Sequence, residues 1–273
     1  MHRVNCPEQP SADVILRAIA EGADPGPWLM PIAGSTLQLL DLITPTSGLA
    51  DYALADGAMQ RLVERPVGDP DVLLLLQHPP VATLGRRGGR ENLRDTVWHD
   101  EQGEAIAVAV HETARGGNLT MHAPGQLVGY PIAQLPQLQM PIGRGSIGDL
   151  PAYVRALQDA IIASCGNFGV AAQGSEGFPG VWCNERDKIA SIGVGVRRGW
   201  SFHGFAVNVD PILGLFSLMT PCGLQGVRLT SLCEQLRARG EPVPALEPFA
   251  ADLAVQLGHR LNRVATHAAA ADR

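Results

Sequence analysis

The sequence contains one lysine, Lys188, although lysine and arginine together number 21. A partly desolvated lysine can give up its proton near neutral pH, whereas an arginine stays charged. Lys188 opens the apolar run 188–196, so the stem of its side chain has a core to lie along. Two interpretations stay open: a lysine at a strand edge, and a proton-accepting group in a functional site.

Paired cysteines and long apolar runs are also missing. The cysteines are odd in number and lack paired spacing, which favours free thiols in a reducing compartment; they are Cys6, Cys165, Cys183, Cys222 and Cys233. No apolar run approaches the roughly 20 residues that span a membrane. Acidic side chains within residues 8–24 are not typical of a secretory signal or a mitochondrial presequence. We therefore expect a cytoplasmic protein without a membrane partner.

Several ligand classes lack their sequence signatures. There is no GxxxxGK[ST] loop for nucleotide phosphates and no dinucleotide fingerprint. No HxxxH pair or His–Cys cluster supports a metal site, so we expect neither a metal nor a bound cofactor. The net charge of −6 argues against a nucleic-acid partner. The nearest basic cluster, GRRGGR at 85–90, is either a solvated loop or a contact for an acidic protein.

Hydrophobic periodicity predicts a mixed α/β protein in which helices pack on a sheet. The clearest helix is expected over 147–169. The continuous apolar run in 71–80 predicts a strand buried on both faces, and Ser231 with Glu234 has the spacing of a capping box at a helix start. Other helices are expected at 12–21, 47–66 and 247–265, and other strands at 37–43, 81–85, 105–113, 125–135, 180–183, 188–199 and 200–210.

The organisation along the chain is simple, because no internal repeat, linker or low-complexity tract follows residue 35. We expect an N-terminal extension over residues 1–35, partly disordered, which holds the short helix. Residues 36–265 are expected to form a single catalytic domain.

Cys222 stands in the segment LMTPCGLQG, where proline and glycine flank it in a tight turn. Such a turn suits a nucleophile, although a free cysteine is also often a small buried hydrophobe. His122 and His203 stand out because glycine or proline turns flank both, whereas a lone histidine is usually structural. A lysine close to Cys222 would lower the pKa of the thiol and then serve as a base. The 34 positions between Lys188 and Cys222 (222 minus 188) leave that contact open.

Four stretches, in this order, resemble the lipoyl(octanoyl) transferase family. Residues 77–88 are similar to its His-Pro-Pro and Thr-Leu-Gly run. Residues 115–132, RGGNLTMHAPGQLVGYPI, resemble its Arg-Gly-Gly, Thr-x-His and Pro-Gly-Gln-Leu signature. Residues 180–209 are similar to its Lys-Ile-Ala and His-Gly-Phe-Ala-x-Asn-Val block, and residues 221–232 to its Pro-Cys-Gly and Thr-Ser-Leu segment. The resemblance covers roughly residues 37–261, and four ordered motifs are far more specific than one.

The resemblance implies a fold shared with biotin and lipoate protein ligases. It implies transfer of an octanoyl group from octanoyl-acyl carrier protein to a lysine of lipoyl domains, in E2 subunits of 2-oxoacid dehydrogenases and in glycine cleavage H protein. Cys222 corresponds to the thioester nucleophile and Lys188 to the residue that lowers its pKa. We also expect a monomer. The substrate-binding stretches correspond to Arg115, Gly116, Gly117, Asn118, Leu119, Thr120, Met121, His122, Ser191, Ile192, Gly193, Gly204, Phe205 and Ala206.

Three positions depart from the family pattern, namely Asn118, Met121 and Ala123. We expect Met121 and Ala123 to reshape the acyl pocket. The glycines at 116 and 117 lack a Cβ and would let the backbone approach the acyl thioester closely. The oxyanion of the reaction needs hydrogen-bond donors, for which backbone N–H groups near Cys222 and the side chain of His122 are both candidates.

Two other functions are weighed against transfer. An ATP-dependent lipoate or biotin ligase of the same fold would use Lys188 to orient an acyl-adenylate and would need no cysteine nucleophile. A binding module that keeps the fold without activity would have no use for Cys222 and Lys188 together. An acidic carrier protein could meet the arginines of 85–90 or those at 197–198.

Overall fold

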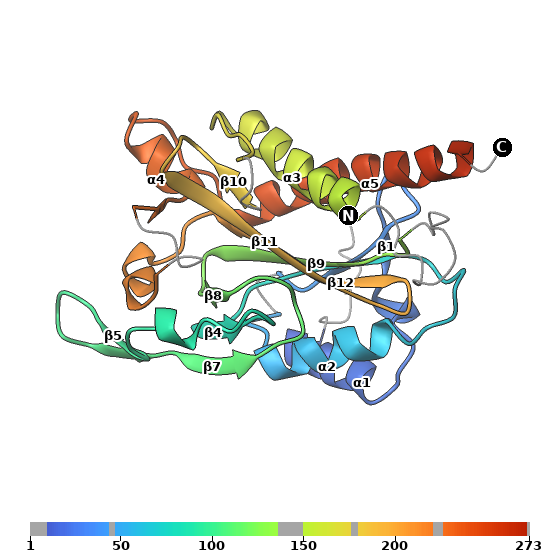
Figure 1. Ribbon diagram of the computed structural model, residues 1–273, viewed down its shortest axis with the longest axis horizontal. Helices are drawn as coiled ribbons and strands as arrows, with labels where there is room; N and C mark the ends of the chain where they lie inside the picture. The colour runs from blue at the N-terminus through green and yellow to red at the C-terminus, as the bar shows by residue number, and fades with distance from the viewer. Residues whose placement is uncertain (1–9, 44–46, 136–149, 176–179, 221–225, 272–273) are drawn as a thin grey trace, which may run out of the picture.

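The computed structural model describes residues 10–43, 47–135, 150–175, 180–220 and 226–271. Helices lie on both faces of a mixed sheet (Figure 1). The helices are α1 (Ala12–Ala20), α2 (Tyr52–Leu62), α3 (Leu150–Asn167), α4 (Leu232–Arg237) and α5 (Leu246–Ala271), with short 3-10 turns η1 (Gly26–Trp28), η2 (Arg90–Asn92) and η3 (Leu213–Leu218). The expected helices are thereby confirmed, although several are shorter than the sequence suggested.

The main sheet runs in the order β1-β2-β3-β9-β12-β11-β10, and β13 pairs with β11. The β2–β3 and β11–β13 pairs are parallel and the others antiparallel. Its strands are β1 (Met30–Pro31), β2 (Gln38–Asp41), β3 (Val72–Leu76), β9 (Gln126–Ile132), β10 (Gly180–Trp182), β11 (Asp187–Arg197), β12 (Trp200–Asn208) and β13 (Arg228–Leu229). Every residue of β3, β9 and β12 is buried, as expected for strands covered on both faces.

A second sheet of order β7-β4-β8 lies beside the first, next to a ribbon of β5 and β6. Its apolar side packs against η3. The strands are β4 (Val81–Leu84), β5 (Val97–His99), β6 (Ala105–Ala107), β7 (Ala109–Glu112) and β8 (Leu119–His122). The single strand expected over 105–113 is wrong, because the chain changes partner at Val108. This residue is 5% exposed in the apolar cluster and its N–H donates to the Thr96 carbonyl, so β6 pairs with β5 and β7 with β4.

Two apolar cores separate the sheet from its helices. Helices α3 and α5 cover one face, while α1 and α2 cover the other (Figure 1). The Asp51 side chain caps α2 by accepting a hydrogen bond from the Leu54 N–H at 3.1 Å. Ser231 caps α4 by accepting from the Glu234 N–H at 3.0 Å, as the capping-box spacing predicts. None of the helices within the described ranges is long and apolar enough to cross a membrane.

Helix α1 belongs to the same core as α2. Ile15, Leu16 and Ile19 are fully buried against the α2 side of the sheet, and the Asp13 carboxylate accepts a hydrogen bond from the Asp51 N–H at 2.8 Å. Residues 12–20 are therefore packed on the domain that follows them. The division between residues 1–35 and 36–265 stays a prediction.

We expect Ile15→Ala to destabilise the fold by about 2–5 kcal/mol, because it empties a fully buried site between α1 and α2. Urea unfolding of the full chain measures this free energy. The neighbouring Val14 is 57% exposed, so Val14→Ala is the control and should change the stability by less than about 0.5 kcal/mol. Equal effects of the two variants would show that α1 does not contribute to the core.

Candidate functional site

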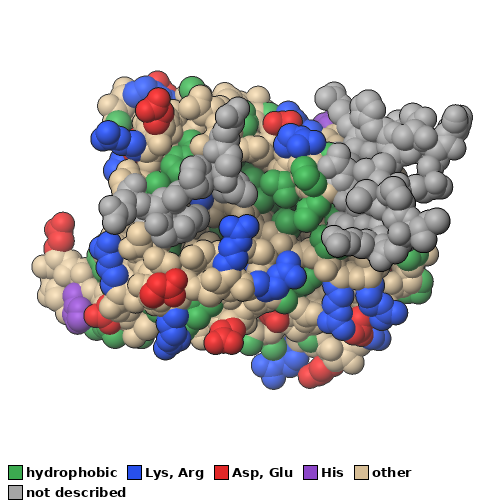
Figure 2. All heavy atoms as spheres, in the orientation of Figure 1, with side chains coloured by type: hydrophobic (Ala, Val, Ile, Leu, Met, Phe, Trp, Pro, Cys, Tyr) green, Lys and Arg blue, Asp and Glu red, His purple; other side chains and the backbone are tan. Residues whose placement is uncertain are grey.

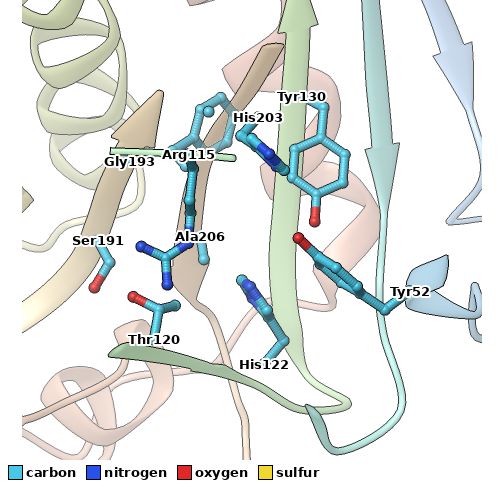
Figure 3. A pocket seen from close by; sticks show the side chains of 11 residues that line it. Tyr52, Arg115, Thr120, His122, Tyr130, Ser191, Gly193, His203 and Ala206 are labelled. Atoms are coloured by element: carbon cyan, nitrogen blue, oxygen red, sulfur yellow. The ribbon is translucent and has the colours of Figure 1, made fainter. Parts of the chain in front are cut away.

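A cavity of about 320 Å³, measured with its open mouth, lies where β8, β9, β11 and β12 meet α2. Figure 3 shows its polar side chains converging from these elements on one space. The lining residues are Tyr52, Arg115, Thr120, His122, Tyr130, Ser191, Gly193, His203, Gly204, Phe205 and Ala206.

All three stretches that the resemblance assigned to substrate binding reach this cavity. The antiparallel pairing of β11 with β12 sets Ser191 opposite Ala206 and Gly193 opposite Gly204. Strand β8 brings Thr120 and His122 to the same space. Segments about 70 positions apart in the chain therefore form one wall, as the ordered motifs predict.

The remaining residues of these stretches do not line the cavity. Side chains alternate along a strand, so Leu119 and Met121 point away from Thr120 and His122. Both pack in the apolar cluster of the second sheet, together with Ala123. Met121 and Ala123 therefore do not line this cavity, and their expected effect on the acyl pocket stays a prediction. Ile192 likewise packs toward the α3 and α5 core, and Gly116, Gly117 and Asn118 are also outside the lining.

The guanidinium group of Arg115 is built into the cavity wall. Only 6% of this residue is exposed. Its Nε and Nη2 donate to the hydroxyl and carbonyl oxygens of Thr83, and its Nη1 donates to the Gly116 carbonyl at 3.0 Å. A Cβ on Gly85 would lie 2.5 Å from the Gly117 carbonyl oxygen, so glycine is required there for this close approach. The positive charge is thus held in a fixed position.

His122 occupies the cavity as a neutral ring with a defined tautomer. Its Nδ1 lies 2.8 Å from the Gln126 side-chain oxygen. The Gln126 amide nitrogen donates to the Met121 carbonyl and to Asn208 Oδ1, and Asn208 Nδ2 donates to the Thr230 carbonyl. These bonds fix both amide orientations, so His122 Nδ1 must be the donor.

Burial lowers the pKa of His122 well below its usual range, and the neighbouring His78 adds to this effect. The ring is therefore neutral at pH 7, and the proton on Nδ1 is committed to Gln126. Its Nε2 can then only accept a hydrogen bond. His122 in this state does not donate to an oxyanion, so the backbone N–H groups near Cys222 remain as candidates.

Two tyrosines of the cavity, Tyr52 and Tyr130, had no signal in the sequence. The Tyr130 hydroxyl donates to His78 Nε2 at 2.8 Å, because His78 Nδ1 donates to the Ala50 carbonyl at 2.6 Å. Burial raises the pKa of both tyrosines above the ordinary range, so both phenols keep their protons. His78, read as structural from the sequence, is a fully buried, hydrogen-bonded support of this wall.

His203 also lines the cavity and has an uncommon backbone conformation, with φ of 54°. Its Nε2 faces Asp56 Oδ1 on α2 at 3.9 Å, and neither atom has a hydrogen-bond partner among the described residues. Burial lowers the pKa of His203 to about 3 and raises the pKa of Asp56. The glycine-flanked context had singled out His203, but its partner Asp56 could not be found from the sequence.

Lys188 is 2% exposed, although it carries an amine. It lies on β11 between Trp182 of β10 and Leu229 of β13, so the strand-edge interpretation is wrong. Its Nζ lies 5.4 Å from the centre of the Trp182 ring. A Cβ on Gly180 would lie 2.6 Å from Lys188 Cε, so this glycine leaves the space that the lysine side chain fills.

Cys222 lies outside the described residues, and no contact between Cys222 and Lys188 is described. The segments on either side of it are placed. Thr220 donates its N–H to the Asn92 carbonyl. Leu229, seven positions after Cys222 (229 minus 222), pairs with Lys188 in the parallel β11–β13 ladder. Residues 228–229 therefore lie beside the strand of the lysine.

Three other cysteines have environments typical of packing residues. Burial raises the pKa of Cys165 to about 12 and of Cys183 to about 11, and it also raises the pKa of Cys233. A thiol with a raised pKa is a poor nucleophile at neutral pH. These residues behave as the sequence predicts. Within the described ranges no cluster of three or more histidine, cysteine or carboxylate side chains could hold a metal ion.

Comparison with known families fits this geometry. Residues 51–250 match the family model of the lipoyl protein ligase A/B catalytic domain. The chain belongs to this family. Its fold class is the one that the motifs implied, a mixed sheet flanked by helices.

Among curated relatives, the chain is similar to several proteins named octanoyltransferase. It is 39% identical over 201 residues to that of Desulfovibrio desulfuricans, covering 74% of this chain and 79% of the relative. It is 42% identical over 193 residues to that of Acidobacterium capsulatum, covering 69% and 76%. The chain is therefore an acyltransferase of the octanoyl-transferring type, as its motifs predict.

Solved structures agree on the fold. A lipoate-protein ligase A bound with ATP aligns with a TM-score of 0.56 at 15% identity, covering 75% of this chain and 81% of that one. An archaeal bi-partite lipoate protein ligase from Thermoplasma acidophilum, studied with its E2 lipoyl domain, aligns with a TM-score of 0.53 at 15% identity, covering 78% and 82%. At this identity the likeness concerns the fold alone.

The buried histidines predict how stability depends on pH. In the folded protein burial holds the pKa of His78 at about 4 and that of His203 at about 3, below the unfolded value of about 6.5. The unfolded chain then binds more protons below about pH 6.5, so the free energy of unfolding falls as the pH falls from 7 to 4. Each histidine contributes a slope of up to about 1.4 kcal/mol per pH unit.

We expect His78→Gln to make this pH dependence shallower, because it removes one titrating group. Urea unfolding at pH 7, 6 and 5 gives the slope of the unfolding free energy against pH for wild type and variant. A loss of stability that is the same at every pH does not change this slope. An unchanged slope would show that His78 is not held neutral by its burial.

Proposed function

We propose that the protein takes an octanoyl group from octanoyl-acyl carrier protein, holds it as a thioester on Cys222 and transfers it to a lysine of a lipoyl domain. The acceptors are the E2 subunits of 2-oxoacid dehydrogenases and glycine cleavage H protein. One observation carries the proposal. The single lysine of the chain is buried on β11, and it pairs there with β13, the strand that follows Cys222 in the sequence. The family membership and the octanoyltransferase relatives support the acyl group.

The first step is an exchange between two thioesters. Lys188 accepts the proton of the Cys222 thiol, and the thiolate attacks the carbonyl carbon of the donor. A new C–S bond forms and the donor's C–S bond breaks. The carrier thiolate leaves and takes the proton from Lys188, which becomes neutral again. The thioester bond that breaks and the thioester bond that forms have similar energies, so the exchange needs no ATP.

The second step forms an amide. The acceptor lysine gives up a proton to Lys188, and its neutral amine attacks the carbonyl carbon of the acyl-enzyme. A C–N bond forms as the C–S bond to Cys222 breaks, and the leaving Cys222 thiolate takes the second proton of the attacking nitrogen. The developing oxyanion needs donors, each worth about 3 kcal/mol, which we assign to backbone N–H groups near Cys222.

The cavity beside β11 and β12 is proposed to hold the acyl chain. Each methylene that leaves water contributes about 0.8 kcal/mol, so an eight-carbon chain supplies several kcal/mol of binding. Phe205 and Ala206 offer it apolar surface, and Arg115 is proposed to face the polar thioester end. We further propose that the enzyme acts as a cytoplasmic monomer, with residues 36–265 as a single catalytic domain.

Intact-mass analysis after incubation with octanoyl-acyl carrier protein tests the nucleophile. Wild type should gain one octanoyl group without ATP, because the donor thioester is already activated, and Cys222→Ser should gain none. Lys188→Met keeps the length of the side chain without its amine and should form the adduct far more slowly. A reaction that requires ATP would instead indicate a ligase, and full transfer by Lys188→Met would mean that another group is the base.

Gly180→Ala tests whether the position of Lys188 matters. Its Cβ would lie 2.6 Å from both Lys188 Cε and the Ala190 carbonyl oxygen, and displacement of a reacting group by 1 Å can cost about 100-fold in rate. We expect the rate of acyl-enzyme formation to fall by up to that factor. Gly199→Ala is the matched control, because Gly199 also has a positive φ, of 83°, with nothing within 4 Å of an added Cβ. Equal losses would point to backbone strain.

A further inference from the structure

Residues 85–94, here called the arginine loop, are strongly basic in a chain of net charge −6. Arg86, Arg87, Arg90 and Arg94 are exposed, and Glu91 is the acidic residue among them. No ion pair between described residues involves these arginines. Figure 2 shows basic side chains spread over one face, including its middle, with acidic ones among them. Since the single lysine is buried, the exposed basic side chains are arginines.

One end of the loop is bonded to the cavity wall. The Arg86 N–H donates to the Arg115 carbonyl at 3.0 Å, and the Arg87 N–H donates to the Gly117 carbonyl at 3.1 Å. A Cβ on Gly89 would overlap the side chain of Asn118, so the loop is packed directly on the strand entry that leads to Thr120 and His122. The charges of Arg86 and Arg87 therefore have a fixed position relative to the cavity.

The other end of the loop reaches the segment before Cys222. The Arg94 N–H donates to the Leu218 carbonyl at 2.7 Å, and Arg94 Nη2 donates to the Thr220 hydroxyl at 3.3 Å. Arg94 also lines a hollow together with Arg228 and Leu229 of β13, the strand that pairs with Lys188. The loop thus extends from the wall of the cavity to Thr220 and to β13, the strand that pairs with Lys188.

The second arginine cluster, at 197–198, is less suited to a partner of this site. Arg197 is already paired, with Glu64 at 3.6 Å and with the Gln60 side chain at 2.9 Å. It lies nine positions beyond Lys188 on the same strand, which is about 30 Å at the rise of a β-strand. The two clusters that the sequence left equivalent therefore differ in pairing and in distance from the lysine.

We propose that the arginine loop is the docking surface for an acidic face of the protein that delivers the acyl thioester. The inference rests on the proposed function, because it requires a donor that is itself a protein. The donor fits better than the acceptor: it must insert its whole acyl chain along the wall from which the loop starts, whereas the acceptor brings only an amine. Arginines at the rim of a site raise the association rate of an acidic partner and make it sensitive to salt.

The test compares two octanoyl donors, octanoyl-acyl carrier protein and the small neutral thioester of N-acetylcysteamine. The variant is Arg86→Glu with Arg87→Glu, which keeps the backbone hydrogen bonds of the loop. We expect kcat/KM for the protein donor to fall about tenfold or more at low salt and to lose most of its salt dependence. The small donor should react at close to the wild-type rate. The control, Arg17→Glu with Arg155→Glu, makes the same change in net charge on exposed residues outside both arginine clusters.

Three results would overturn the docking surface. An equal loss of kcat/KM with both donors would show that the variant disturbs the cavity wall. An equal loss of kcat/KM in the control variant would show that the effect comes from the net charge of the protein. A loss confined to transfer from the acyl-enzyme to a lipoyl domain would assign the loop to the acceptor. The proposed function fails differently, since wild type would then form no adduct on Cys222 with either donor.

Discussion

A chain of buried hydrogen bonds ties the wall of the cavity to the strand that carries Lys188. It runs from His122 through Gln126 and Asn208 to the Thr230 carbonyl, and the Thr230 N–H then donates to the Lys188 carbonyl at 3.0 Å. Every link joins a different strand or turn, so β8, β9, β12 and β11 are held in one arrangement. Such a network is stable when each buried group has a partner and is costly when one is lost. The cavity and the lysine are therefore parts of one rigid unit.

Burial also determines which side chains of the site carry a charge. It keeps His78, His122 and His203 neutral and both tyrosines protonated. The fixed positive charge of Arg115 then stands among neutral donors and acceptors, in a region where water screens it weakly. The exposed charges that could attract a protein lie outside, on the arginine loop. In the proposed mechanism, the acyl group and its carrier therefore bind to separate parts of one continuous surface.

Much of this arrangement could be predicted from the sequence, because the periodicity of 150–167 and the apolar run 72–76 reflect local physics. The ordered motifs also located the strands that meet at the cavity. The alternation of side chains along β8 separates Thr120 from Met121, a distinction that the motif alone does not make. The facing of His203 and Asp56 could not be predicted, since it depends on how α2 packs on β12. The burial of Lys188 likewise depends on a glycine eight positions earlier (188 minus 180), whose missing side chain has meaning only in the folded sheet.

The central claim is that Lys188 activates Cys222. The most direct measurement is the pH dependence of the alkylation rate of Cys222, followed by mass analysis in a Cys6→Ser background; burial raises the pKa of the other cysteines and keeps them slow. The account predicts a thiol pKa below the ordinary value of about 8.5, and a higher pKa in Lys188→Met. An ordinary pKa that is the same in both proteins would contradict it.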